Sequence, residues 1–206
     1  MALVSGNIVM KRILLAILVI AVCLTSFAQS QITGIWGIDF NSSMTTVTQR
    51  LISRGVNSSD ILKSPTNIII EGSVRFASEN FEGCCFFFDK DQFKMVVFNK
   101  AIQYEDAFTT HLNYKQAEQW LTNNRYKVNQ VLSSLKSDLV SKYGTPHLER
   151  EDRLLWKSAN GNIIEIEVKK TLDISSEIGK PEMYNKYGAI PQYHISVIIV
   201  QPQESM

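Results

Sequence analysis

Residues 68–104 read IIIEGSVRFASENFEGCCFFFDKDQFKMVVFNKAIQY, and this stretch decides the fold class. Apolar and polar side chains alternate over residues 68–76, which is the period of a strand with one buried face. An aromatic-rich run follows at residues 81–88, and the polar residues 89–92 are typical of a turn. Because residues 93–104 are again rich in apolar side chains, the stretch predicts three strands in an antiparallel meander.

A helix is predicted before this meander and another after it. Over residues 43–54 apolar side chains recur at helical spacing, and Gly55 follows in the position of a C-terminal cap. The second helix carries an apolar stripe and is expected to end before Gly144. The stripe consists of Val128, Leu132, Leu135 and Leu139. The intervening residues 105–125 are polar and mixed, and the pattern leaves a long loop and an irregular helix as alternatives.

Three further strands are predicted after the second helix. Residues 154–157 and 162–170 flank Asn160-Gly161, which is a strong hairpin signal, and residues 193–200 form the last strand. The predicted fold class is therefore α+β, with two helix-plus-three-strand units and an antiparallel sheet. Each helix has one apolar stripe and each sheet one apolar face, so we expect the helices to pack on one face of the sheet.

The domain is expected to span residues 29–206 as a single unit with two similar halves, about 32–104 and 115–201. The two halves share the same order of elements and little sequence. The apolar stripe of the second helix is predicted to pack on the inner faces of the strands. Its expected neighbours are Trp156, Ile164 and Ile166.

Residues 1–28 have the pattern of a secretory signal peptide. Two basic residues precede an apolar run of about 10–12 residues, which is too short for the roughly 20 residues of a membrane span. Ser26-Phe27-Ala28 then fits a small-x-Ala cleavage site. We expect export to the periplasm or cell surface, a mature chain that begins at Gln29, and no membrane span after cleavage. The branched Val22 before Cys23 disfavours a lipid anchor.

Charge and composition exclude some classes of function. The chain of 206 residues has 45% apolar and 20% charged residues, which is typical of a globular protein. Lys11 and Arg12 are the charged residues of the signal segment, so 19 basic and 20 acidic residues remain for residues 29–206. No basic surplus is left to attract phosphates, and nucleic acid is therefore not an expected partner.

Cys84 and Cys85 are the two cysteines after the signal segment, and they are adjacent. Neighbouring residues of a strand point to opposite faces, so a disulfide between these two would be strained. We predict two free thiols that serve as small apolar side chains. A reactive or metal-binding pair is the alternative, although no C-x-x-C or Cys/His spacing supports it.

Three segments carry a resemblance to a known group of proteins: GIDFNSSM at residues 37–44, LISRG at 51–55 and LVSKYGTP at 139–146. They resemble uncharacterised secreted proteins of Bacteroides-type bacteria. In these, a G-i-p-F segment leads into a helix with a Lys-Gly-like end, and a later helix ends in Lys-Tyr-Gly-x-Pro. Asp39 stands where that group usually has proline. The helix-plus-strands units are similar to those of beta-lactamase-inhibitor-protein-like domains. The resemblance implies export and this fold, and it implies no activity.

No catalytic, cofactor-binding or metal-binding residue is predicted. His111, His147 and His194 lack metal-ligand spacing, and no G-x-S-x-G motif or Gly-rich phosphate loop is present. Glu165 and Glu167 share one strand face. We expect them to form the solvent-facing side of the strand, in preference to a pair of catalytic carboxylates. The expected function is a non-catalytic exported binding module, with another envelope protein as its partner. A hydrolase with a site assembled from scattered residues, and a protein inhibitor by fold analogy, are the alternatives.

The aromatic hairpin provides the candidate binding surface. A symmetric turn without a bulge pairs Phe86 with Met95 on the face that the helices cover. The opposite face is then also apolar, although a face in contact with water usually carries polar side chains. The candidate partner-binding patch consists of Phe87, Val96 and Phe98, with Lys94 and Lys100 at its rim. The alternative is that the chain's own segment 105–125, with Trp120 and Leu121, covers this face.

Overall fold

The computed structural model describes residues 30–104, 112–173 and 190–202. Every element described below lies within the unit Gln31–Met206. Its helices are α2 (Met44–Ser53), the 3₁₀ turn η1 (Ser58–Asp60) and α3 (Tyr114–Tyr143). Its strands are β1 (Gly34–Ile35), β2 (Ile38–Asp39), β3 (Ile61–Lys63), β4 (Asn67–Phe76), β5 (Glu79–Asp89), β6 (Gln92–Gln103), β7 (Leu148–Arg150), β8 (Arg153–Lys157), β9 (Ile163–Asp173) and β10 (Ile190–Val200).

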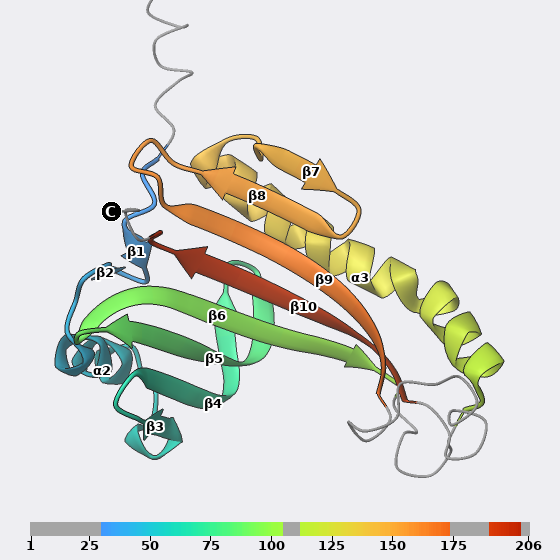
Figure 1. Ribbon diagram of the computed structural model, residues 1–206, viewed down its shortest axis with the longest axis horizontal. Helices are drawn as coiled ribbons and strands as arrows, with labels where there is room; N and C mark the ends of the chain where they lie inside the picture. Colours follow the sequence, from blue (N-terminus) through green and yellow to red (C-terminus); the bar gives the residue numbers. More distant parts are fainter. Residues whose placement is uncertain (1–29, 105–111, 174–189, 203–206) are drawn as a thin grey trace, which may run out of the picture. The chain divides into compact units, whose positions relative to one another are not determined.

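Eight strands form one antiparallel sheet in the order β3-β4-β5-β6-β10-β9-β8-β7, and β1 pairs with β2 in a separate hairpin (Figure 1). The predicted α+β class with an antiparallel sheet is thus confirmed. Strands β3–β6 follow α2 and form a first series, and β7–β10 follow α3 and form a second. The last strands of the two series, β6 and β10, are neighbours at the centre of the sheet. The prediction of three strands after each helix is one strand too few. The additional strands are β3 after α2 and β7 after α3. Each of these has three residues, which is too short for an alternating pattern to be recognised.

Capping side chains set the helix ends. At the start of α2, the Ser43 hydroxyl accepts a hydrogen bond from an amide of the first turn. At the start of α3, Asn113 and Gln116 form a reciprocal capping box, with both hydrogen bonds at 3.0 Å. The helix ends at Tyr143 and is capped by Gly144, whose φ of 77° lies in the left-handed region. Of the two alternatives for residues 114–125, a helix is therefore correct, and these residues form the first turns of α3.

One face of the sheet, here called the inner face, packs against both helices in a single buried cluster. The side chains of one row across this face lie directly opposite one another and are at most 2% exposed. The row consists of Trp156, Ile164, Ile199, Val96, Phe86 and Ile68. The predicted stripe of α3 joins the cluster, with Val128, Leu135 and Leu139 buried and Leu132 partly buried. Trp156, Ile164 and Ile166 are buried as predicted.

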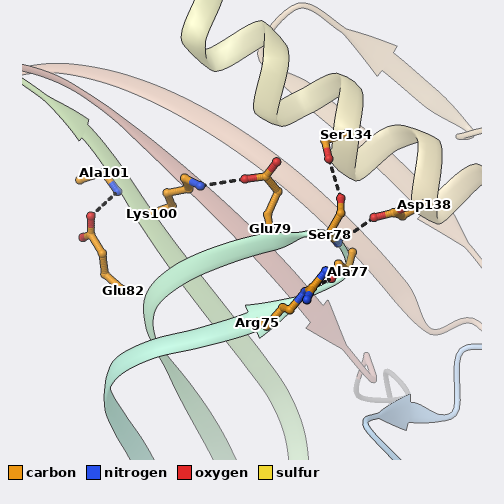
Figure 2. Close-up of polar contacts among 9 residues, drawn as sticks. All are labelled: Arg75, Ala77, Ser78, Glu79, Glu82, Lys100, Ala101, Ser134 and Asp138. Carbon is orange, nitrogen blue, oxygen red and sulfur yellow. Dashed lines mark hydrogen bonds and ion pairs between the residues drawn. The ribbon is translucent and has the colours of Figure 1, made fainter.

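Polar contacts tie the turn between β4 and β5 to α3 (Figure 2). The amide of Ser78 donates to Asp138 Oδ2 at 2.8 Å, and the hydroxyls of Ser78 and Ser134 lie 2.5 Å apart. Within the turn, Arg75 Nε donates to the Ala77 carbonyl at 3.3 Å. These contacts hold the tip of the β4–β5 hairpin against the helix, and they close the inner face at this end.

Candidate functional site

A β-bulge in β6 divides the predicted binding patch between the two faces of the sheet. Just beyond the hairpin turn, Phe87 pairs with Met95, so Lys94 is an extra residue in this strand. One extra residue moves every later side chain to the opposite face. The predicted pairing of Phe86 with Met95 is therefore wrong, because Phe86 pairs with Val96.

The bulge places two predicted patch residues in the core. Val96 and Phe98 lie on the inner face and are 0% exposed. The Phe98 ring stacks on Phe76 with centroids 5.0 Å apart, and it meets the Trp36 ring edge-on at 5.3 Å. Phe87 is the one apolar member of the predicted patch whose side chain lies on the face opposite the helices.

The two predicted rim lysines are engaged in other contacts. Lys94 Nζ donates to Asn41 Oδ1 at 2.5 Å and to Gln201 Oε1 at 3.3 Å. Lys100 forms an ion pair with Glu79 at 2.8 Å, close to the start of β5 (Figure 2). Both ammonium groups are therefore held by the protein's own side chains, and the charge of Lys100 is paired with Glu79.

Residues 112–125 belong to the segment expected to cover the aromatic face, and they lie on the inner face of the sheet. The carbonyl of Leu121 accepts a hydrogen bond from the Tyr193 hydroxyl at 2.8 Å, and Tyr193 belongs to the buried cluster. Trp120 is partly buried against the same cluster. Residues 112–125 therefore do not cover the aromatic face, contrary to that alternative. Residues 105–111 lie outside the described part of the chain.

The face opposite the helices, here called the open face, is apolar over about half of its length. No helix in the described ranges packs on it. A first row crosses five strands and consists of Leu62, Ile69, Cys85, Val97 and Ile198. A second row, nearer the β5–β6 turn, consists of Phe87, Met95, Val200 and Ile163. Leu62 and Ile69 are 46% and 38% exposed, and the others are partly exposed.

The remainder of the open face is polar, as expected for a solvated antiparallel sheet. This polar half includes Asn99, Ser196, Glu167, Arg153, His194 and Lys169. Its charges pair with one another: Arg153 Nε lies 2.5 Å from Glu165, and Lys169 Nζ lies 3.0 Å from Glu167. Glu165 and Glu167, the carboxylates that share a strand face, are thus each bound to a basic side chain. The apolar half consequently has a polar border.

The two adjacent cysteines lie on different faces of the sheet, and both are free thiols, as predicted. Cys84 is buried on the inner face, where burial and then the neighbouring Cys85 raise the pKa of its thiol. Burial also raises the pKa of the Cys85 thiol on the open face. Both thiols are therefore protonated at neutral pH, and a protonated thiol is a poor nucleophile.

The histidines are dispersed, and they do not form a metal site with the described residues. His194 lies on the open face in β10, and His147 Nδ1 accepts a hydrogen bond from the Lys157 amide at 3.2 Å. His111 lies outside the described ranges. In those ranges, no group of three or more His, Cys, Asp or Glu side chains is arranged to hold a metal ion.

Comparisons with family models, with curated proteins and with solved structures find no match to this chain. None of the described helices has both the length and the apolar character needed to cross a membrane. The candidate functional site is therefore defined by geometry, as the apolar half of the open face and its polar border.

Proposed function

We propose that residues 29–206 form an exported, non-catalytic binding module, which holds another envelope protein on the open face of its sheet. The observation that carries this proposal is the apolar half of that face. Solvated faces of antiparallel sheets usually carry polar side chains, whereas these nine positions are apolar and partly exposed. An apolar surface that no described helix covers marks an interaction site of this kind.

The size and border of the apolar half support a protein partner. Strands lie about 4.8 Å apart and same-face residues about 6.8 Å apart, so the two rows together cover roughly 300 Å². Functional patches on soluble proteins have about this area. An apolar centre with a polar rim is also the usual anatomy of a protein interface. The short edge strands β3 and β7, three residues each, make pairing at the sheet edges the less favourable mode of association.

Export to the periplasm or cell surface is part of the same proposal, and the signal-peptide pattern of residues 1–28 supports it. N-terminal sequencing of protein from an exporting host is expected to begin at Gln29. A chain that retains residues before Gln29, or that carries a lipid on Cys23, would contradict this part. We also propose membership in the Bacteroides-type secreted group, which rests on the sequence segments that resemble it.

The two halves, about 32–104 and 115–201, are further proposed to be similar units. Each half has a helix followed by antiparallel strands. The strand order supports this, because the second series follows the first in reverse and the two series meet at β6 and β10. In this proposal the open face is a composite surface to which both halves contribute, and neither half alone presents all of the apolar half.

Photo-crosslinking in the exporting host tests the binding proposal. A photoreactive amino acid at position 87 is expected to yield an adduct of discrete mass with an envelope protein. The matched control has the same amino acid at Ser137, an exposed position of α3 on the other side of the molecule. Addition of excess unlabelled protein should suppress the adduct at position 87. Equal yields of adduct at both positions, or none at position 87, would refute the proposed site.

A further inference from the structure

A cavity of about 700 Å³ lies on the inner side of the sheet, where α3, the β7–β8 turn, β9 and β10 meet. Cations from three different elements line it: Arg125 of α3, Arg150 of β7 and Lys170 of β9. Its volume is within the range of about 300–1,000 Å³ that is common for small-molecule sites. The cavity and the apolar half of the open face lie on opposite sides of the sheet, so the two surfaces are separate.

Arg125 is held in place by the protein itself. Its Nη2 donates to the Glu151 carbonyl at 2.6 Å and lies 3.4 Å from the carboxylate of the same residue. Its guanidinium carbon lies 5.7 Å from the centre of the Tyr193 ring. Burial raises the pKa of Tyr193, although Arg125 opposes this shift, so the ring beneath the cation stays neutral. A guanidinium that is already oriented loses little conformational freedom when it binds a ligand.

The cations of this cavity have hydrogen-bonding capacity that the described residues do not use. Arg150 and Lys170 are exposed, and neither has an ion-pair partner among those residues. Two carboxylates, Glu151 and Asp152, also line the cavity, so a positive surplus remains. The Glu151 side chain is 85% exposed, and water therefore screens its charge.

We infer that this cavity binds the oxyanion group of a ligand, a phosphate or a carboxylate, between Arg125, Arg150 and Lys170. The planar guanidinium of Arg150, which has no ion-pair partner among the described residues, presents parallel N–H groups that match two oxygens of such a group. Val168 and the Tyr193 ring supply an apolar wall for the body of the ligand. The cavity is larger than a lone phosphate requires, so the expected ligand is a small molecule with an anionic group. This site goes beyond the proposed protein-binding function and is independent of it.

Anion titration followed by amide NMR shifts tests the inference. Protein from an exporting host is titrated with inorganic phosphate and, in a second arm, with acetate, at constant ionic strength. Saturable shifts are expected at Lys170, Tyr193 and their neighbours, and the tighter of the two anions identifies the preferred group. The double variant R150Q/K170Q is expected to weaken binding about tenfold or more, because two charge-assisted contacts are lost. Arg150→Lys, which keeps the charge and loses the fork, is expected to weaken it about fivefold.

The matched control is K63Q/K157Q, which removes the same charge from two exposed lysines outside the cavity. Its affinity is expected to stay within about twofold of the parent protein. Equal weakening in the two double variants would show a general charge effect and overturn the inference. Absence of saturable shifts with either anion, up to about 100 mM, would also overturn it, because that concentration exceeds the range of even weak specific sites.

Discussion

The two faces of the β5–β6 hairpin differ in burial although both carry apolar side chains. On the inner face, Phe86 and Phe98 are 0% exposed, beneath the helices and the Trp36 ring. On the open face, Phe87 and Val97 are partly exposed, and no described helix packs on them. The comparison shows that apolar character alone does not separate core from binding surface. The difference comes from which face the helices cover, and each prediction below tests that difference.

The largest effect is expected from Phe98→Ala on the inner face. Phe98 packs against Trp36, Phe76 and Phe81, so truncation leaves a cavity that the surrounding rings cannot fill. The free energy of unfolding in urea should fall by about 3–5 kcal/mol. Phe87→Ala is the matched control, and its loss should be about 1 kcal/mol, because this side chain already contacts water. Losses of equal size would mean that the two faces are covered alike.

Truncation of the covering helix should have the next largest effect. Leu135 is 0% exposed and lies in the stripe of α3 that packs on the inner face. Leu135→Ala is expected to lower the free energy of unfolding by about 2–5 kcal/mol. Ser137→Ala, at an exposed position of the same helix, should change it by less than about 0.5 kcal/mol. A loss below that value for Leu135→Ala would show that a different face of α3 covers the sheet.

Cys84 and Cys85 are neighbours in the chain but lie on opposite faces of the sheet, so their reactivities compare the two faces. Burial raises the pKa of both thiols, with the buried Cys84 less accessible than Cys85. At pH 8, alkylation of the native protein should modify Cys85 at least about tenfold faster than Cys84, a ratio worth about 1.4 kcal/mol. Single Cys→Ser variants assign the two rates by mass spectrometry. Equal rates in the native protein would contradict the assignment of the two faces.

The raised pKa values of the two thiols make the free energy of unfolding depend on pH. The ordinary thiol pKa is 9.0, and the folded values are higher. As pH rises above about 9, the unfolded chain therefore releases its thiol protons before the folded chain does. The free energy of unfolding should then decline with pH, and the decline should be smaller in the variant that carries Cys84→Ser. An unchanged pH profile in that variant would contradict a buried Cys84.

Much of the inner face could be predicted from local pattern. The stripe of α3, the alternation in β9 and the glycine at residue 144 are signals that depend on near neighbours in the chain, and all of them hold in the structure. The start of α3 had a local signal as well. Asn113 and Gln116 have the spacing of a capping box, which identifies a helix start about one turn before the first clear apolar stripe.

The open face could not be predicted in the same way, because it depends on the bulge at Lys94. Residues 93–98 are apolar at nearly every position, so either register buries a plausible set of side chains. The bulge exchanges Val96 and Val97 between the faces, and with them the identity of the candidate site. One signal was available: consecutive apolar residues in both β6 and β10 indicate two apolar faces without identifying the covered one.

Replacement of the two neighbouring valines by threonine tests the central claim most directly. Val96 is 0% exposed on the inner face, Val97 is partly exposed on the open face, and threonine has nearly the shape of valine. Val96→Thr buries a hydroxyl without a partner, and the free energy of unfolding should fall by about 1–3 kcal/mol. Val97→Thr places its hydroxyl in water and should change it by less than about 0.5 kcal/mol. Equal losses in the two variants would show that the open face is core, and would contradict its proposed role as a binding surface.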